Sequence, residues 1–438
     1  MTNPLGDYID ALRSGNLDAD LTSLYGRAEL SGQKARYGKL FKGMETRFAP
    51  DSAAVIISPG RTELGGNHTD HNHGRVLAAA VHLDCVAAAA PVRGMQVAIQ
   101  SAGFTELIRA DLSDLAPRPA ERGRPESLVR GVAAGLAEKG YQLGGFCACV
   151  DSTVLPGSGL SSSAAFANLI GGILNGLFNG GAAAAIDLAG IAKQAENDFF
   201  GKPCGFMDQL AGALGGILHI DFEHPSDPKL ERITFDFTRA GYRLAVVDTG
   251  GDHAGLTPEY AAVTEEMRAV ALLLGQEYLR GLSVKEIVRA LPQLRLKAGD
   301  RAVLRAIHFV EENRRVGSMA AALRRNRVDE YLNLVSASGD SSWRRLQNCL
   351  RASTPRTQGI ALALTLTERF LDGRGACRVH GGGFEGTIQA YVPQERFDDY
   401  RQYMQGVFGA GSVTAVRIRR SGLSVLRPGG LERTSEQD

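Results

Sequence analysis

Short apolar runs in the first part of the chain predict β-strands. Residues 53–57, 76–90, 95–100 and 147–150 are rich in β-branched side chains, alternate between apolar and polar, or are apolar throughout. The first run leads into Ser58-Pro-Gly60, whose turn-forming residues predict that this strand ends there.

Helical spacing marks most of the remaining chain. Apolar residues recur at helical intervals before residue 50, after Ala164, and from Tyr260 to about Leu371. The polar, glycine-containing tail from Gly429 is expected to be disordered.

A turn-rich break near residue 225 predicts a domain boundary. His224-Pro-Ser-Asp-Pro228 is followed by runs at 232–237 and 243–248 that predict strands. We therefore expect two domains, residues 1–225 and 226–438.

Composition and charge exclude several classes of function. The 438 residues carry 49 Lys and Arg against 48 Asp and Glu, so no overall field attracts nucleic acid or an anionic membrane. The first residues lack the basic and apolar regions of a signal peptide, and polar residues interrupt the apolar stretches 76–92 and 166–192. Six scattered cysteines predict neither a disulfide framework nor a zinc site. We expect a cytoplasmic protein that acts on small molecules, with no nucleic-acid or membrane partner.

Fifty-three glycines, about twice the usual share, gather beside Ser, His and Asp. The strongest cluster is Leu155-Pro-Gly-Ser-Gly-Leu-Ser-Ser-Ser-Ala164, between a predicted strand and a predicted helix. Gly157 and Gly159 let backbone approach an oxyanion, and the following helix start supplies N–H donors. The alternative is a serine-rich helix cap after a turn. A Walker A loop is excluded because Gly-Lys-Ser/Thr is absent, and Ser162 replaces the third glycine of a dinucleotide-binding motif.

A second cluster, residues 58–74, contains His68, Asp70, His71 and His73. These side chains could ligate a metal, but their spacing is not that of a standard structural zinc site. Many hydrogen-bond donors and acceptors with one Arg at the start suit a polyol substrate better.

Two further segments contain candidate chemistry. Gly201-Lys-Pro-Cys-Gly-Phe-Met-Asp-Gln209 places Asp208 in an apolar helical setting, where it is either functional or a capped structural carboxylate. Gly375-Ala-Cys-Arg-Val-His-Gly-Gly-Gly-Phe-Glu-Gly386 precedes an alternating strand, and its adjacent glycines mark a second close approach of the backbone.

These four segments, in this order, resemble the motifs of the GHMP kinases, and specifically the galactokinase branch. Pro59-Gly-Arg and Gly66-Asn-His-Thr-Asp-His-Asn72 are similar to the galactokinase signature, and residues 155–164 resemble the family's ATP-phosphate loop. The resemblance covers about residues 50–395. It implies an α+β fold of two domains with mixed sheets and helices, and an active site in the cleft between the domains.

The resemblance also implies roles for individual residues. Asp208 would face the anomeric hydroxyl of the sugar, and Arg61 would lie between Asp208 and the transferred phosphoryl group. Ser162 or Ser163, together with Glu196, would hold Mg²⁺ against ATP. The expected sugar contacts are Asn67, His68, Asp70 and Tyr260, and the expected ATP contacts are Gly157, Ser158, Gly159, Leu160, Ser161, Ser162 and Ser163.

The chain departs from the galactokinase pattern at several positions. Asn67 stands where the family has Glu, and His71 where it has Tyr; Glu63 and Gly65 replace the usual Asn and Ile, and His380 replaces a small residue. Position 67 is implied to lie near the C6 group of the sugar. Asn67→Glu is therefore expected to favour plain galactose over a sugar with a C6 carboxylate.

The implied activity is ATP- and Mg²⁺-dependent phosphorylation of galactose at its C1 hydroxyl. One alternative is the same chemistry on galacturonate or another modified galactose. An alternative from a different class is a non-catalytic sugar sensor, which the presence of both Arg61 and Asp208 disfavours.

Overall fold

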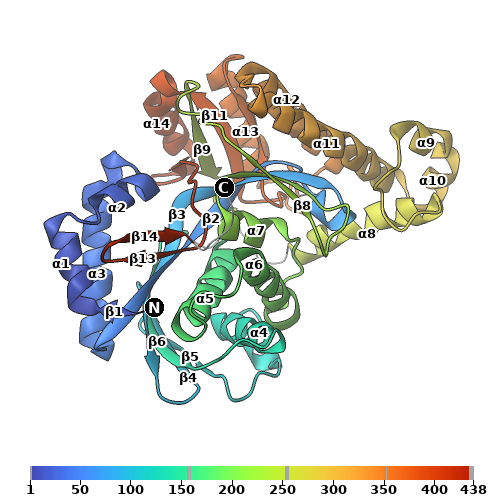
Figure 1. The fold of residues 1–438 in the computed structure, drawn as a ribbon. Helices are drawn as coiled ribbons and strands as arrows, with labels where there is room; N and C mark the ends of the chain where they lie inside the picture. The colour runs from blue at the N-terminus through green and yellow to red at the C-terminus, as the bar shows by residue number, and fades with distance from the viewer. Residues whose placement is uncertain (1, 155–156, 158, 252–255, 352, 434–438) are drawn as a thin grey trace.

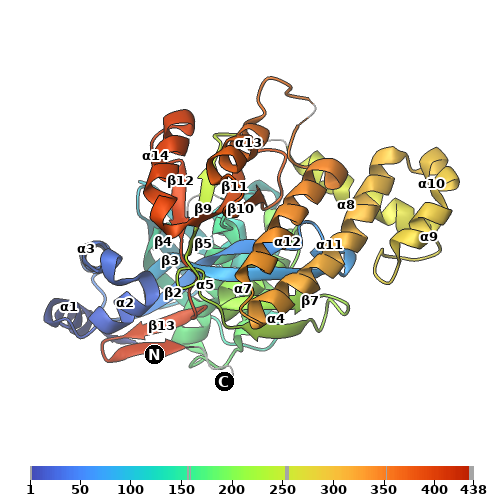
Figure 2. The same cartoon turned by 90° about the horizontal axis from the view of Figure 1, so that it is seen from above.

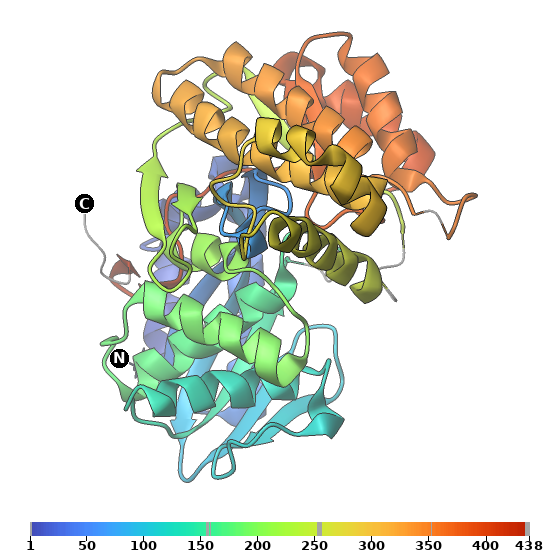
Figure 3. The same cartoon turned by 90° about the vertical axis from the view of Figure 1, so that its right-hand side faces the viewer.

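The computed structural model describes residues 2–154, 157, 159–251, 256–351 and 353–433. The chain forms two β-sheets, each with helices packed against it (Figure 1). Figure 3 separates a part built around the smaller sheet from a part that contains the larger sheet and α4–α7, whose bounds follow. The expected α+β architecture is confirmed.

The larger sheet has ten strands in the described residues. They are β1 (Asn3–Pro4), β2 (Ser52–Gly65), β3 (Arg75–Val92), β4 (Gln96–Ser101), β5 (Leu107–Asp111), β6 (Gly145–Ser152), β7 (Ile217–Asp221), β8 (Lys229–Ile233), β13 (Ser424–Arg427) and β14 (Gly430–Arg433). Its main path runs β14-β13-β2-β3-β6-β4-β5, and β1, β7 and β8 pair outside this path. Only β4 and β6 pair in parallel among these strands.

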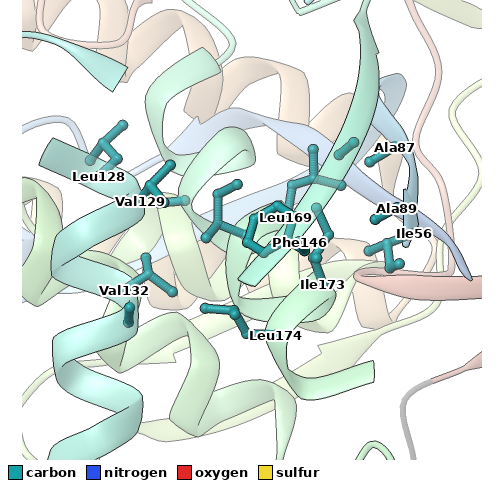
Figure 4. Close-up of a cluster of buried hydrophobic side chains, with 14 of the residues drawn as sticks. Ile56, Ala87, Ala89, Leu128, Val129, Val132, Phe146, Leu169, Ile173 and Leu174 are labelled. Carbon is teal, nitrogen blue, oxygen red and sulfur yellow. The ribbon is translucent and has the colours of Figure 1, made fainter. Parts of the chain in front are cut away.

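Helices cover both faces of this sheet. One face carries α1 (Leu5–Ser14), α2 (Asp18–Tyr25) and α3 (Leu30–Phe48), and the other carries α4 (Pro125–Glu138), α5 (Ser162–Phe178), α6 (Ala185–Gln194) and α7 (Met207–Leu214). In β3, Ala87 and Ala89 face the core beneath α4 and α5 (Figure 4), whereas Val86 and Ala88 face α1–α3. This burial on both sides explains why β3 is apolar throughout rather than alternating.

The smaller sheet has the order β10-β11-β9-β12, with all pairs antiparallel. Its strands are β9 (Tyr242–Asp248), β10 (Ala376–His380), β11 (Thr387–Pro393) and β12 (Val413–Val416). The helices of this part are α8 (Thr257–Leu273), α9 (Val284–Arg289), α10 (Leu291–Lys297), α11 (Asp300–Arg324), α12 (Val328–Ser341), α13 (Gly359–Leu371) and α14 (Phe397–Phe408). Helices α13 and α14 cover one face, α11 and α12 pack on the other, and α8–α10 project to one side (Figure 2).

No helix in the described part of the chain is both long enough and apolar enough to cross a membrane.

Several sequence predictions need correction at strand ends. The strand predicted at 53–57 does not stop at Ser58–Gly60; β2 continues to Gly65, because a register shift after Pro59 lets pairing with β3 resume at Arg61. The strand predicted at 232–237 extends only to Ile233. The tail expected to be disordered contains β14.

Some residues beyond the expected boundary near residue 225 belong to the same sheet as residues before it. Because β8 pairs with β7 and β13 pairs with β2, residues 229–233 and 424–433 belong to the larger sheet. The chain passes to the smaller sheet through residues 234–241 and returns through residues 417–423. The division into two independent domains stays a prediction.

A buried ion cluster explains one polar residue inside β3. Asp84 is fully buried, and its carboxylate accepts hydrogen bonds from Arg36 Nη1 at 2.8 Å, Tyr25 Oη at 2.7 Å and Arg419 Nη1 at 2.9 Å. These partners come from α3, α2 and the returning segment 417–423. Asp84 therefore ties the N-terminal helices and the C-terminal segment to the central strand.

Candidate active site

Arg61 of β2 and Asp208 of α7 form a bidentate ion pair. Arg61 Nε donates to Asp208 Oδ1 at 2.6 Å, and Nη2 donates to Oδ2 at 2.8 Å. The two side chains are 8% and 19% exposed. Asp208 lies in the first turn of α7, where the helix dipole favours negative charge. The pair therefore presents one carboxylate in a fixed orientation that solvent still reaches.

The glycine–serine loop lies directly against this pair. Arg61 Nη1 donates to the Gly159 carbonyl at 2.5 Å, and the Arg61 N–H donates to the Leu160 carbonyl at 3.1 Å. The Ser161 hydroxyl donates to Asp208 Oδ2. Helix α5 begins directly after Ser161. Its first N–H groups, which lack partners within the helix, are therefore placed beside Arg61 and Asp208 to receive an anion.

Close packing explains the glycine at position 159. Gly159 has φ +72°, and a Cβ there would lie 2.4 Å from Thr387 Oγ1 and 2.8 Å from His380 Nδ1. Ser161 also has a positive φ, of 63°, which is uncommon for a residue with a side chain. Ser158, to which an ATP contact was assigned from the sequence, lies outside the described residues.

His380 connects the last glycine cluster to β2. Its Nε2 accepts a hydrogen bond from the Glu63 N–H at 3.3 Å and lies 3.0 Å from Thr62 Oγ1. Burial lowers the pKa of His380 well below its ordinary value, so the imidazole is neutral. The ring therefore fills the space beside Gly159 without adding a charge near Arg61.

Ser163 and Glu196 meet at the other side of the loop. The Ser163 hydroxyl donates to Glu196 Oε1 at 2.5 Å, and Gln209 Nε2 donates to Glu196 Oε2. Lys202 Nζ lies 3.8 Å from Glu196 Oε1 and 3.4 Å from Ser163 Oγ. Glu196 belongs to a π-helical turn, η4 (Ala195–Phe200), that continues α6. The Glu196 carboxylate is thus buried but held beside a hydroxyl at the start of α5.

These donors fit Mg²⁺ better than a softer metal. A hydroxyl and a carboxylate are hard oxygen ligands, and Mg²⁺ commonly takes one or two protein oxygens and completes its shell with phosphates and water. No group of three or more His, Cys, Asp or Glu side chains in the described residues is arranged to hold a metal alone. The Ser163–Glu196 pair could therefore hold Mg²⁺ only together with a phosphate ligand. Ser162, the other candidate ligand, stands in the same turn of α5.

His68 and Tyr260 form a second wall of the site. Their rings stack with centroids 6.3 Å apart, and His68 Nε2 lies 2.8 Å from the Gly382 carbonyl. Burial lowers the pKa of His68 to about 3, so Nε2–H of a neutral ring donates this bond. A Cβ on Gly382 would lie 2.5 Å from Tyr260 Cε1, which explains the need for glycine there.

Asp70 lies against the segment that leads into α7. A Cβ built on Gly205 would collide with Asp70 Oδ2, so only glycine lets this carboxylate sit so near the start of α7. His71 donates its N–H to Asp70 Oδ1 at 3.0 Å. Burial alone would raise the pKa of Asp70, but the hydrogen bonds and charge of His71 hold it below the ordinary value. Asp70 is therefore an ionised acceptor close to the Asp208 helix.

Asn67 is turned into the protein. It is 1% exposed, and its Nδ2 donates to Glu63 Oε1 at 3.1 Å and to the Gly381 carbonyl at 2.7 Å. Its Oδ1 accepts from Asn348 Nδ2 at 2.7 Å. Both ends of the amide are thus occupied by protein groups, and its role as a sugar contact stays a prediction.

A buried polar network beneath the site was not predicted. Glu63 pairs with the fully buried Arg378 of β10, and Glu312 Oε1 accepts from the Gly66 N–H at 3.0 Å. Burial raises the pKa of Glu63, and the Arg378 charge opposes this. The only hint of this network in the sequence was Glu63, which stands where the family usually has Asn. Glu312 and Asn348 lie in no recognisable motif.

The structure brings the expected site residues into three adjoining groups. They are Arg61, Asp208, Gly159, Leu160 and Ser161; Ser163 and Glu196; and His68, Asp70, Tyr260 and Asn67.

Family models match two parts of the chain. Residues 45–91 match the galactokinase galactose-binding signature, and residues 127–216 match the GHMP kinases N-terminal domain. The chain is 30% identical to a galactokinase of Streptomyces coelicolor over 377 residues, which cover 85% of this chain and 92% of the relative. It is 28% identical to a galactokinase of Glaesserella parasuis over 359 residues, covering 82% and 90%.

Solved structures with the same fold include members of both sugar- and mevalonate-kinase groups. The galactokinase of Lactococcus lactis complexed with galactose superposes with a TM-score of 0.76 at 24% identity, covering 89% of this chain and 99% of that one. A mevalonate kinase superposes with a TM-score of 0.59 at 14% identity, covering 84% and 99%.

Proposed function

This chain belongs to the galactokinase family of the GHMP kinases, and from that premise we propose that it transfers the terminal phosphoryl group of ATP to the C1 hydroxyl of galactose. The products are galactose 1-phosphate and ADP. The observation that carries the proposal is the bidentate Arg61–Asp208 pair lying against the glycine–serine loop.

In this reaction Asp208 accepts or holds the proton of the C1 hydroxyl and orients that oxygen toward the phosphorus. Arg61 bonds both Asp208 oxygens, and its Nη1 reaches the Gly159 carbonyl, so it bridges the acid and the phosphate loop. There its charge offsets negative charge that develops on the phosphoryl oxygens. Phosphoryl transfer depends mainly on such positioning and charge stabilisation, so no protein nucleophile is required.

ATP phosphates would be received by the N-terminus of α5 and the loop before it. The loop backbone can approach the phosphates closely because Gly157 and Gly159 adopt positive φ. Mg²⁺, held by Ser163 and Glu196 with the phosphates, would neutralise phosphate charge. Gln209 fixes the second oxygen of Glu196 and so orients the carboxylate.

The sugar would occupy the space between Asp208 and the His68–Tyr260 wall. The ionised Asp70 would accept hydrogen bonds from sugar hydroxyls, and the ring of Tyr260 would offer an apolar face to the sugar. The neutral His68 donates to Gly382 and thereby orients that wall rather than adding charge.

A second candidate substrate, galacturonate, is favoured by one observation. The uncharged Asn67 stands where a Glu is expected, so position 67 itself does not repel a C6 carboxylate, and the charge of the neighbouring Glu63 is offset by Arg378.

An ADP-release assay with galactose, galacturonate, glucose and N-acetylgalactosamine tests the proposal. ATP- and Mg²⁺-dependent ADP release with galactose, and phosphate found on C1 of the product, are expected. Preference for galacturonate would select the second candidate. Sugar binding without ADP release from any of the four would refute the kinase and leave the sensor.

A further inference from the structure

A large cleft lies where the chain passes between its two sheets. It has a volume of about 1610 Å³. Its walls include the segment 232–240, which leads from β8 to β9, and the segment 416–423, which leads from β12 back to β13. We call it the connector cleft.

The connector cleft is separate from the candidate active site. Leu214, at the C-terminus of α7, lines it, whereas Asp208 stands in the first turn of the same helix. Arg232 Nη2 donates to the Leu214 carbonyl at 3.1 Å. None of the catalytic or phosphate-loop residues described above lines this cleft.

Positive charge is concentrated on the cleft walls. In the described residues five arginines and a single acid, Asp236, line it, although the whole chain has a net charge of only +1. Arg324 pairs with Glu231. The other four, which are Arg232, Arg239, Arg417 and Arg420, have no carboxylate within ion-pair distance in the described part of the chain.

Unpaired guanidinium groups in a concave site are suited to phosphate groups. Each offers several N–H donors in a planar fork that matches phosphate oxygens, and concave walls of one charge focus the field on a small ligand. The remaining wall is mixed, with the apolar Phe235 beside hydroxyl and amide side chains such as Thr238 and Asn326. This combination fits a ligand that has both a charged phosphate chain and an apolar or ring portion.

We propose that the connector cleft is a second ligand site, which binds a small compound bearing two or more phosphate groups. One phosphate group cannot reach several of these arginines at once, whereas a chain of two or more can, and the apolar side chains add to binding when the phosphate chain carries an organic group. The site is independent of the kinase activity, because it shares no residue with the Arg61–Asp208 centre.

Calorimetric titration of the full chain with sodium tripolyphosphate, without Mg²⁺, tests the proposal. The cleft variant is Arg239→Gln with Arg420→Gln, since both side chains are exposed and have no ion pair in the described residues. The control variant is Arg289→Gln with Arg369→Gln, which removes two exposed arginines elsewhere. We expect the cleft variant to lose one binding event, or to weaken it about tenfold, and the control to match the wild type.

The phosphate loop keeps its own affinity for phosphate in both variants, so only the difference between them reports the cleft. Equal tripolyphosphate binding by the two variants would overturn the proposal. Hydrogen exchange gives a second readout on the wild type: tripolyphosphate should slow exchange in residues 234–241 and 417–423, and unchanged exchange there would also overturn it. ADP release by the cleft variant at saturating substrates should equal that of the wild type, so this result and the kinase test can fail separately.

Discussion

The ion pair between Arg61 and Asp208 means that replacing one carboxylate oxygen of Asp208 by an amide nitrogen tests the role of its charge. Asp208→Asn keeps the size of the side chain but removes the charge that faces Arg61 and the proton acceptor for the sugar hydroxyl. We expect kcat to fall by about 10²–10⁴-fold, the range usual for a positioned acid–base group. ATP binding, measured by calorimetry, should persist. A variant that keeps more than a tenth of the parent kcat would contradict the role given to Asp208.

Ser163 can be tested through the metal requirement. Ser163→Ala removes the hydroxyl 2.5 Å from Glu196 Oε1. The Mg²⁺ concentration for half-maximal activity and the KM for ATP should each rise about tenfold, with the KM for galactose little changed, because the hydroxyl serves metal and phosphate. Ser162→Ala is the comparison variant, and a larger rise in its Mg²⁺ requirement than in that of Ser163→Ala would assign the metal to Ser162 instead. A raised KM for galactose with unchanged Mg²⁺ dependence would refute the assignment.

From the sequence, Asn67→Glu was expected to change sugar preference. The structure indicates that it also affects stability, because Asn67 contacts Glu63. The Asn67 amide nitrogen lies 3.1 Å from Glu63 Oε1, so Asn67→Glu would place two buried carboxylates together. Unit charges ~4 Å apart at a dielectric constant of ~20 interact by about 4 kcal/mol, and we expect the free energy of unfolding to fall by about 2–4 kcal/mol. Urea unfolding measures this loss.

The paired change Glu63→Gln with Asn67→Glu removes that repulsion. It should regain only part of the lost stability, because Glu63→Gln also takes the carboxylate partner from the buried Arg378. The preference between galactose and galacturonate is best measured in this double variant. If Asn67→Glu alone is as stable as the wild type, Glu63 and Asn67 are not the coupled pair that their contact indicates.

Individual site residues could be predicted from the sequence where they lie together in a short motif, and not where their partners are far away in the chain. Arg61, Asp208 and the loop residues occur within short motifs, because phosphate and proton acceptors need fixed local geometry. Glu312, Asn348 and the Glu63–Arg378 pair were not found, because their partners are brought together only by the packing of α11 and β10 against β2.

Among the elements, the errors arose where distant pairing overrides a local signal. Pro59 and Gly60 favour a turn, yet pairing with β3 on both sides of the register shift keeps β2 extended. Gly429 and its neighbours look unstructured in isolation, but β13 pairs with β2 and β14 with β13. The core strands were predicted because continuous burial leaves an apolar run that needs no knowledge of partners.

The ion cluster around Asp84 predicts that substitution of this one residue of β3 strongly destabilises the fold. Asp84→Ala leaves Arg36 and Arg419 without their shared carboxylate in a buried setting. Loss of one partner of a buried ion pair typically costs about 3–5 kcal/mol, and we expect a loss of that size in urea unfolding. Asp187→Ala, which breaks an exposed pair with Lys139, should cost less than about 1 kcal/mol. Equal losses of unfolding free energy in the two variants would show that the buried cluster stabilises the fold no more than an exposed ion pair does.

Across the whole molecule, Glu312 links α11 to the sugar-side loop and gives stability a defined pH dependence. Burial alone would raise the pKa of Glu312, but the charges of Arg315 and Arg378 lower it from 4.5 to about 2. Because the folded pKa lies below the unfolded value, its contribution is present above about pH 4.5 and is lost as the pH falls toward 2. That contribution is about 3 kcal/mol at neutral pH.

Glu312→Gln isolates this contribution. The stability difference between the wild type and the variant, measured by urea unfolding, should be constant above about pH 5 and should shrink between pH 4.5 and pH 3. A difference that stays constant over this range would show that the Glu312 charge does not stabilise the fold.

Because β13 pairs with β2, the larger sheet cannot be completed early during synthesis on the ribosome. β13 pairs with residues 55–57 of β2, and Arg419 completes the cluster around Asp84, although both lie more than 300 residues further along the chain. While synthesis proceeds, the emerging first half therefore exposes an unpaired strand edge and an incompletely neutralised buried acid. Its sheet closes only after residues 424–427 have left the exit tunnel, so the nascent chain depends on protection from aggregation until that point.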